Sequence, residues 1–369
     1  SHRYAGTPAY LVAPKLEYKG EDWEVVLRGS YSGAEFNFRD NSKGFFQRTD
    51  SWLTGIGFTL DRPSESSHEW ILNQTAGRPW GDPESFNRDA DIGYNIRTAE
   101  SDALNDQHGV NLDLKRHLTF YDNPLTLMGG LGTRSNDWRT NEGAYKQYKY
   151  IGPNGSQTDP ASQIPWTGDY DFAIIGTGAG NMNQQGWRAD SNYAMYDIFK
   201  EHPEYFAPDV VGNLKRELDN NKRIQEEVNA AYLEAETRIG DARIDLGLRY
   251  EQTRTAARIA DVRPLSEVKA AGLDPNTVEG LMFQYNNGRY TTRRGKYDDF
   301  FFSGGVKYDF TDKLVGQVSF SQSILRPDYG NLGGVVSVND DTMIVTVPNA
   351  QLKPEHSTKY YASLQYYLE

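Results

Sequence analysis

Six aromatic or basic residues in the long connecting segments have side chains suited to binding a solute. They are Trp80, Trp138, Trp166, Tyr170, Trp187 and Arg188. Flat aromatic faces beside amide and carboxylate groups suit sugar rings or aromatic siderophores. Loops on a rigid scaffold often carry function. The alternative is that these rings pack within the loops or form an aromatic girdle at a membrane interface. We predict a solute-binding role for all six.

Other kinds of chemistry have little support in the sequence. Gly176, Gly178 and Gly180 mimic a dinucleotide-binding loop, but residues 181–185 do not start a convincing helix, so we interpret this segment as a flexible loop. The 6 histidines have no ligand spacing and the chain has no cysteine. Spacing identifies no nucleophile elbow and no carboxylate pair. We therefore expect no enzymatic activity, no cofactor and no metal site.

The scaffold that must position the loop residues is clearest between Tyr297 and Ile324. Apolar residues fall on every second position on both sides of a turn at residues 311–313. Phe300, Phe302, Val306, Tyr308 and Phe310 share one face of the first arm, and Val318, Phe320 and Ile324 share one face of the second. A period of two predicts strands. Long alternating strands joined by short turns are typical of a membrane-spanning β-barrel, apolar toward lipid and polar toward the lumen.

The composition of the 369-residue chain agrees with a barrel. Tyrosine (24), phenylalanine (16) and glycine (35) are frequent, and the mean hydropathy is −0.72. A barrel has this profile because half of each strand and the loops face water. No apolar run approaches the roughly 18 residues of a membrane-spanning helix. The net charge of −12 and the lack of a basic run argue against nucleic-acid binding.

Short and long connections alternate along the chain. Short turns are expected near residues 20, 63, 122, 240 and 312, and long connections at 33–46, 79–106, 138–222, 259–296 and 326–354. In outer-membrane barrels the short turns are periplasmic and the long loops extracellular. We count roughly eleven strands, one of them along Trp52–Leu60, and expect a short helix near Asn213–Asn220. A soluble β-sandwich is the alternative, but its strands would be shorter.

Three ordered motifs resemble those of TonB-dependent outer-membrane receptors of the proteobacterial type. Glu226–Thr253 contains an E-x-V-x-A-A-Y strand and a G-x-R-Y-E-x-T strand. Tyr297–Tyr329 is similar to the family's Y-D-F-T-D hairpin and the following strand that closes in S-x-x-x-x-R-P. Asn349–Tyr367 is similar to the N-P-x-L-K-P-E motif and its strand, although Ala350 replaces the first proline. Phe302 also stands where the family often has proline.

The resemblance implies a transmembrane antiparallel β-barrel of roughly 22 strands with a plugged lumen. Residues 1–369 would form part of that barrel. The N-terminal plug domain, its TonB box and the C-terminal barrel strands would be absent from this chain. Roughly eleven strands cannot close such a barrel, because open sheet edges leave backbone groups unpaired in lipid. We therefore expect an internal portion of a longer receptor.

Two paired strands carry charged residues on one face, which the resemblance places on the lumen wall. These residues are Glu234, Glu236, Arg238, Arg243, Asp245, Arg249 and Glu251. They either contact solute or plug, or form a charge lattice that holds wall and plug together, and their balanced charges favour the lattice. Arg326, Pro327 and Pro354 are interpreted as structural, because proline belongs at strand ends. A substrate contact is the alternative for Arg326 and Pro327.

The expected function is TonB-dependent import across the bacterial outer membrane. An oligosaccharide is the first solute class and a ferric siderophore the second. The expected partners are TonB and its inner-membrane energising complex, acting through the plug, together with outer-membrane lipid, lipopolysaccharide and the small-molecule solute. Nucleic acid is not an expected partner. A passive porin or a surface adhesion barrel is the alternative, and either would lack a plug and a TonB box.

Overall fold

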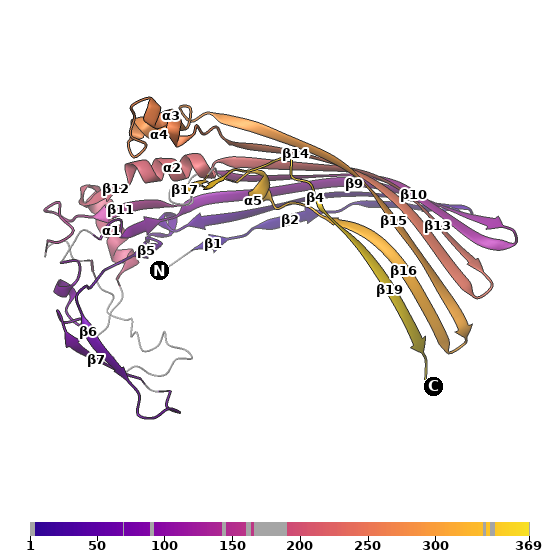
Figure 1. Ribbon diagram of the computed structural model, residues 1–369, viewed down its shortest axis with the longest axis horizontal. Coiled ribbons are helices and arrows are strands. Elements are labelled where there is room, and N and C mark those ends of the chain that lie inside the picture. The colour runs from indigo at the N-terminus through magenta and orange to yellow at the C-terminus, as the bar shows by residue number, and fades with distance from the viewer. Residues whose placement is uncertain are drawn as a thin grey trace.

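One curved antiparallel sheet dominates the computed structural model, which describes residues 4–68, 70–88, 92–141, 145–159, 164–165, 190–334, 337–339 and 344–368 (Figure 1). Its long strands are β4 (Trp23–Arg39), β9 (Glu100–Phe120), β10 (Asn123–Asn141), β13 (Lys222–Ile239), β14 (Ala242–Ala260), β15 (Tyr290–Thr311), β16 (Leu314–Leu325) and β19 (Glu355–Tyr366). Each pairs with the next in this order. The all-β prediction is therefore confirmed.

The first edge of the sheet is made of three short strands. β1 (Ala5–Gly6), β2 (Ala9–Val12) and β3 (Lys15–Lys19) all pair with β4. Among the described residues the sheet has 11 strands, which agrees with the predicted count. β1, β2 and β3 pair with successive parts of β4 and so occupy a single strand position. The wall is therefore nine strands across. Strands of 17 to 22 residues on β4, β9, β10, β13, β14 and β15 are about twice the length needed to cross a bilayer.

Tight hairpins join the strands at the end drawn on the right of Figure 1. Tyr121 and Asp122, both with positive φ (47° and 60°), connect β9 to β10. Two central residues with positive φ form the turn whose twist matches that of a hairpin. Gly240 (φ 59°) serves the β13–β14 turn. Thr311 accepts a hydrogen bond from the Leu314 amide (3.0 Å) at the β15–β16 turn. These turns confirm the predictions near residues 122, 240 and 312.

The predicted strand along Trp52–Leu60 is wrong as a wall strand. Only β6 (Gly57–Asp61) is extended, and it pairs with β7 (Ile71–Ala76) in a separate two-stranded sheet. Gly55 (φ 66°) interrupts the alternation before it. The turn near residue 63 therefore lies inside one long connection, which runs from residue 40 to residue 99. The predicted loops at 33–46 and 79–106 are parts of this connection and of the strand ends beside it.

Two long connections fold together into a compact unit at the other end of the sheet, which we call the joint loop unit. A four-stranded sheet has the order β12 (Phe206–Pro208), β11 (Lys146–Tyr150), β8 (Ile96–Thr98) and β5 (Arg48–Thr49). Helix α1 (Asn192–Glu201) and the short helices η1 (Asn41–Lys43), η2 (Pro83–Ser85) and η5 (Pro203–Tyr205) lie in the same connections. Its core contains Phe46, Ile96, Tyr150, Ile164, Met195 and Phe206. Burial of these apolar side chains stabilises the unit.

The remaining connections are also partly helical. Helix α2 (Val210–Asn220) confirms the predicted helix, and the Asp209 side chain accepts a hydrogen bond from the Gly212 amide at its start (2.9 Å). It packs through Leu218 against α4 (Val278–Gln284), which follows α3 (Leu265–Ala270). The last connection holds α5 (Tyr329–Leu332), β17 (Ser337–Asn339) and β18 (Ile344–Thr346). Among the described residues, every helix is too short or too polar to cross a bilayer.

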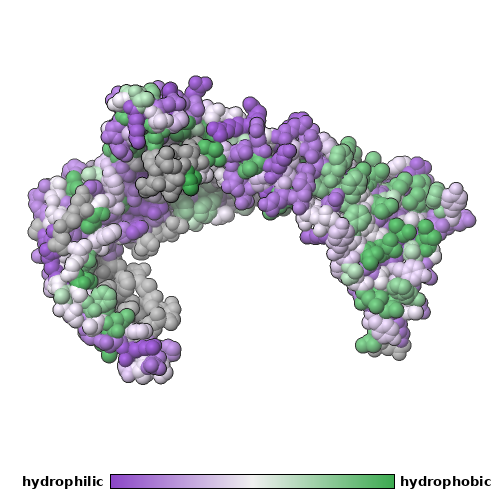
Figure 2. All heavy atoms as spheres, viewed as in Figure 1, coloured by the Kyte–Doolittle hydropathy of each residue, from purple (hydrophilic) through white to green (hydrophobic). Residues whose placement is uncertain are grey.

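The two faces of the sheet differ sharply in polarity, as the sequence predicts. Cross-strand partners Leu233, Leu248 and Phe302 share one face and are 61%, 40% and 51% exposed. Apolar side chains gather over the end of the sheet that carries the tight turns, and polar side chains cover its middle (Figure 2). We call the side of the sheet that carries Leu233, Leu248 and Phe302 the apolar face, and the opposite side the polar face. A band of large exposed apolar side chains on alternate positions is typical of the lipid-facing side of a membrane barrel.

Candidate functional site

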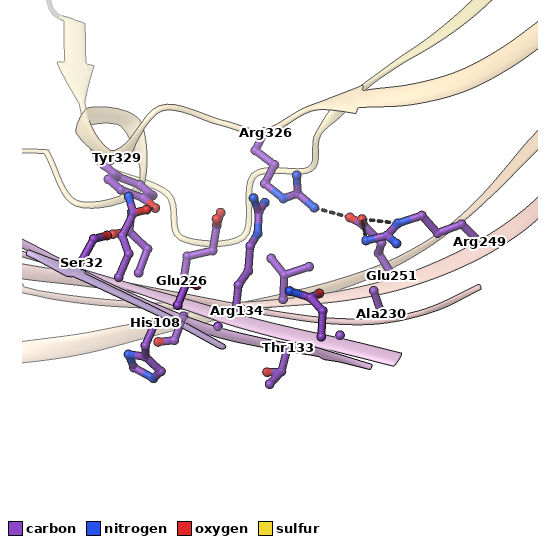
Figure 3. A pocket seen from close by; sticks show the side chains of 18 residues that line it. Ser32, His108, Thr133, Arg134, Glu226, Ala230, Arg249, Glu251, Arg326 and Tyr329 are labelled. Atoms are coloured by element: carbon purple, nitrogen blue, oxygen red, sulfur yellow. Dashed lines mark hydrogen bonds and ion pairs between the residues drawn. The ribbon is translucent and has the colours of Figure 1, made fainter. Parts of the chain in front are cut away.

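A polar cavity of about 460 Å³ lies on the polar face of the sheet, beneath the connection that follows β16 (Figure 3). The charged and aromatic residues that line it are Arg134, Glu226, Arg249, Glu251, Arg326 and Tyr329. Serine, asparagine and glutamine side chains of β4, β9 and β10 complete the lining. The cavity is therefore rich in hydrogen-bonding groups from five strands and one loop.

Strand register determines which residues reach the cavity. Asn136 lies opposite Glu226 in the β10–β13 pairing, and Arg134 lies opposite Val228. Because paired residues point to the same face, these side chains all project from the polar face. His108 and Thr133 have the other parity and point away from the cavity (Figure 3). The cavity is thus assembled by alternation on β10, β13 and β14.

An ion-pair network closes one side of the cavity. The Arg326 guanidinium pairs with the Glu251 carboxylate, and Arg249 donates to the same carboxylate at 2.7 Å. Glu251 is 13% exposed and Arg326 is 20% exposed in their side chains. β16 ends at Leu325, so Arg326 leaves the sheet and its side chain reaches back to β14. Pro327 follows it outside the strand, as the sequence predicts.

Glu226 contributes a carboxylate that the described part of the chain leaves unpaired. The residue is 8% exposed and makes no hydrogen bond or ion pair with any described residue. Its side chain stands between Tyr329 and Arg134 and points toward the connection above the sheet (Figure 3). Tyr329 itself is held by the Asn136 amide. The charges of Arg134 and Arg326 attract this carboxylate, and because its oxygens accept no hydrogen bond from a described residue, Glu226 is suited to accept hydrogen bonds from a bound group.

A profile of the family described as "TonB dependent receptor-like, beta-barrel" matches residues 17–368 of the chain. The chain belongs to this family. Its polar face is therefore the lumen side of an outer-membrane β-barrel wall, and its apolar face is the lipid side. The predicted family and outer-membrane location are confirmed. None of the curated protein sequences matches this chain.

Several solved receptors share low sequence identity with this barrel wall. The ferric citrate transporter FecA in its unliganded form is 10% identical, with a TM-score of 0.47 over 99% of this chain and 33% of FecA. The siderophore receptor PiuA from Acinetobacter baumannii is 11% identical (TM-score 0.47, 99% and 38%). The ferric-catecholate import receptor Fiu from E. coli K12, in its closed form, is 10% identical (TM-score 0.46, 99% and 39%). The chain spans 33–39% of the length of these receptors.

The seven charged residues predicted for the lumen wall all lie on the polar face of the receptor wall, along β13 and β14. Arg243 pairs with Glu236 at 2.5 Å, Arg249 pairs with Glu251, and Arg238 approaches Asp309 of β15 at 3.7 Å. Glu234 and Asp245 make no ion pair with the described residues. A lattice of opposite charges is thus present within the wall, and contact with a plug stays a prediction.

Only two of the six predicted solute-binding residues can be placed. Trp138 packs against the buried cluster of Ile224, Ala257, Ile259 and Ala350, and Lys222 lies 5.8 Å from its ring centroid. Trp80 follows β7, and its amide donates to the Gln74 side chain at 3.1 Å. Trp166, Tyr170, Trp187 and Arg188 lie outside the described residues. Trp138 therefore has a clear packing role, and solute binding by the six residues stays a prediction.

Sequence reasoning missed four residues of the cavity: Arg134, Asn136, Glu226 and Tyr329. Glu226 is the first residue of the E-x-V-x-A-A-Y motif. Arg134 and Asn136 lie two positions apart on β10, in a part of the strand that the alternating apolar pattern does not cover. Their parity could have placed them on the polar face. Their meeting could not have been foreseen, because the register between β10 and β13 joins residues about 90 positions apart. Pro354 is buried directly before β19, which agrees with its structural interpretation.

Proposed function

We propose that the complete receptor containing this wall imports a polar solute across the outer membrane in a TonB-dependent manner. The observation that carries the proposal is the polar cavity on the lumen side, with its unpaired and buried Glu226. Its carboxylate lies in the field of Arg134 and Arg326 but accepts no hydrogen bond from a described residue, so it offers an acceptor to a bound solute. A plug domain and further barrel strands, supplied by other parts of the receptor, would complete the lumen, and TonB would act through the plug.

We propose an oligosaccharide as the solute, with a ferric siderophore as the second candidate. Arg134, Arg249 and Arg326 offer donors, while Glu226 offers an acceptor that still needs donors. Sugar hydroxyl groups both donate and accept, so they can satisfy both kinds of group at once. A negatively charged ferric chelate would use the arginine groups but would be repelled by Glu226. The cavity chemistry therefore favours the neutral, hydroxyl-rich solute.

An uptake assay tests this proposal with the complete gene product in bacterial cells. Radiolabelled oligosaccharides and iron-labelled siderophores are offered to cells that contain or lack TonB. TonB-dependent accumulation of an oligosaccharide is the expected result. Uptake that persists without TonB would identify a passive porin instead, and no uptake of either solute class would reject import.

A matched pair of variants tests the role of the cavity. Glu226→Gln removes the charge inside the cavity, and Glu227→Gln removes the neighbouring charge on the apolar face of the same strand, outside the cavity lining. A lost charge-assisted hydrogen bond costs about 1.5–3 kcal/mol, so uptake by the first variant at limiting solute should fall roughly tenfold or more. The second variant should import normally. Equal uptake by both variants would remove the cavity from the solute path.

A further inference from the structure

The first part of β15 extends beyond its neighbour β16 and leaves one edge of the strand open (Figure 1). The β15–β16 pairing begins at Ser303, whereas β15 itself begins at Tyr290. At the point where the two strands separate, the Phe302 amide donates to the Gln322 side chain at 3.0 Å. Beyond this contact, residues 290–300 have a described strand, β14, on one side only.

The register of β14 and β15 shows which backbone groups face the open side. The Asp261 amide donates to the Arg289 carbonyl at one end of the pairing, and the Asp309 amide donates to the Asp241 carbonyl at the other. Because backbone groups point alternately to the two sides of an antiparallel strand, the odd-numbered residues of β15 bond to β14 and the even-numbered residues face outward. The outward amides and carbonyls that make no hydrogen bond with a described residue belong to Tyr290, Thr292, Arg294, Lys296 and Asp298.

This open edge lies outside the lipid-facing band. Phe300 is the last exposed aromatic residue on the apolar face of β15, and the same face continues beyond it with Asp298, Lys296 and Arg294. Unpaired backbone groups are costly in hydrocarbon but can bond to water outside it. β15 thus loses its neighbour where its face becomes polar, on the side of the long connections, which are extracellular in outer-membrane barrels.

Completion of the barrel does not cover the open edge. In the sheet order β14-β15-β16-β19, the position beside β15 already belongs to β16, so further barrel strands add only at the two ends of the sheet. The last connection is held on the polar face, where Thr255 donates to the Ala350 carbonyl and Arg293 to the Pro348 carbonyl, each at 2.9 Å. Among the described residues, nothing therefore pairs with this edge.

The open edge is also strongly basic. Its four cations are Arg289, Arg293, Arg294 and Lys296. All four side chains are exposed, and none makes an ion pair with a described residue. The nearby acids on the apolar face already accept hydrogen bonds: Tyr250 donates to Asp298 at 2.9 Å, and Asn229 donates to Glu227 at 2.6 Å. In a chain whose net charge is −12, this edge is a local site of positive charge.

We propose that the open edge of β15 accepts an extended, acidic segment of another protein as an added strand. In this mode of recognition the main chain supplies affinity and alternate side chains supply specificity. Acidic side chains of the added strand would lie beside Arg294 and Lys296 on one face or Arg293 on the other, and opposite charges on neighbouring strands attract. Pairing with the same edge of a second copy would bring cation against cation, so the basic residues disfavour self-association. This docking site is independent of the imported solute.

Hydrogen exchange, resolved amide by amide on the complete gene product in nonionic detergent, tests whether the edge is open. In the receptor alone, the even-numbered amides of residues 290–298 should exchange faster than the odd-numbered ones, because only the latter bond to β14. A capped peptide of alternating glutamate and valine, as long as the edge and at saturating concentration, should slow the even-numbered amides roughly tenfold or more. Protection of these amides without peptide would show that another part of the receptor occupies the edge. That result, or unchanged exchange with the peptide, would overturn the proposal.

Two control peptides separate backbone pairing from charge. Methylation of all amide nitrogens in the glutamate peptide removes the donors that an added strand needs, and should weaken binding roughly tenfold or more because several hydrogen bonds are lost. Lysine in place of glutamate should weaken binding about tenfold, because it places cations beside cations. Equal binding of the methylated peptide would reduce the edge to a charged patch, and equal binding of the lysine peptide would remove its acidic specificity. Either result would reject the proposal.

A matched pair of proline variants tests the geometry of the edge. The Thr292 amide faces the open side, so Thr292→Pro should leave the urea unfolding midpoint of the barrel nearly unchanged but weaken binding of the glutamate peptide roughly fivefold to tenfold. The Thr291 amide faces β14 opposite Ile259, so Thr291→Pro should lower the midpoint. Equal midpoints in the two variants would show that the open and paired amides are wrongly assigned.

A charge reversal tests specificity without relying on a loss of binding. Arg294→Glu with Lys296→Glu should bind the lysine peptide more tightly than the glutamate peptide, the reverse of the original preference. The variant is first checked for the β-sheet circular dichroism of the folded barrel. A folded variant that still prefers the glutamate peptide would reject these two cations as the residues that select an acidic strand.

Discussion

Arg326, the first residue after β16, pairs with Glu251 in the interior of β14, although 75 residues separate them in sequence. This pair fixes the start of the last connection against the polar face. Tyr329, three residues later, is fixed by Asn136 of β10. The two contacts hold the connection over the cavity from opposite sides, so the shape of the cavity depends on both.

A double-mutant cycle should show that Arg326 and Glu251 are coupled. Arg326→Met and Glu251→Gln should each lower the free energy of unfolding by about 1–3 kcal/mol, because each leaves a largely buried polar partner unpaired. The double variant should lose less than the sum of the two. Urea unfolding of the detergent-solubilised barrel measures all four proteins. Strictly additive losses would show that the pair contributes nothing beyond its separate residues.

Gly295→Ala should displace the connection that contains Ala350. The added methyl group would overlap the Ala350 carbonyl oxygen, and forced overpacking of this kind costs about 1–3 kcal/mol. Limited proteolysis of residues 344–354 should become faster. Gly129→Ala is the matched control, since its methyl group would lie 3.5 Å from the nearest atom, an ordinary contact. Unchanged proteolysis of the Gly295 variant would contradict the close approach.

Phe46→Ala should unfold the joint loop unit without unfolding the wall. Phe46 is fully buried and contacts the rings of Tyr196 and Phe199, with centroids 5.5 Å and 5.4 Å away. Removing a buried phenylalanine side chain costs about 3–5 kcal/mol, which a small unit cannot absorb. Hydrogen exchange should accelerate in α1 and β11 but not in β13. Phe58→Ala, at a position 56% exposed on β6, should change neither.

The joint loop unit should lose stability as the pH rises from about 4 to above 6. Burial raises the pKa of the Asp190 carboxyl from 3.8 to about 6, although the Ser51 hydroxyl donates to it at 2.9 Å. The folded unit therefore binds more protons than the unfolded chain between these values, and its stability falls with increasing pH in that window. The total change is about 2–3 kcal/mol. Hydrogen exchange of α1 across this pH range measures it.

Asp190→Asn is the control for this pH dependence. The amide keeps a hydrogen-bond acceptor for Ser51 but does not titrate, so the slope of stability against pH between 4 and 6 should flatten. Because Asp190 carries no charge in the variant, the unit should also be more stable than the original at neutral pH. A slope that survives the substitution would assign the effect to other groups.

The wall was predictable from the sequence because its signal is local. Alternation on Phe300, Phe302 and Val306 needs only the pleat of one strand, and turns at Asp122 and Gly240 need only their own backbone geometry. Trp52–Leu60 shows the limit of this reasoning. Its alternation is as regular as that of a wall strand, yet β6 pairs within its own connection. Alternation identifies a strand but does not identify the partner of that strand.

The cavity and the joint loop unit could not be predicted because they depend on distant pairings. Phe46, Ile96 and Phe206 form one core from segments about 160 residues apart, and nothing in each segment alone indicates that it will meet the others. Glu226 and Arg326 come together only after β13, β14, β15 and β16 have adopted their register. Trp138, for which solute binding stays a prediction, also packs beside Ile224, a contact that its place near a predicted loop did not indicate.

The shared core of the joint loop unit has a consequence for motion at the mouth of the barrel. The described segments of connections 40–99 and 142–221 that form this core cannot move separately, because either movement would expose Phe46 or Met195 to water. Any opening must move both as one body, with hinges where the unit meets β4, β9, β10 and β13. The core then opens through one equilibrium rather than two, and a label on α1 reports the same event as a label beside Phe46.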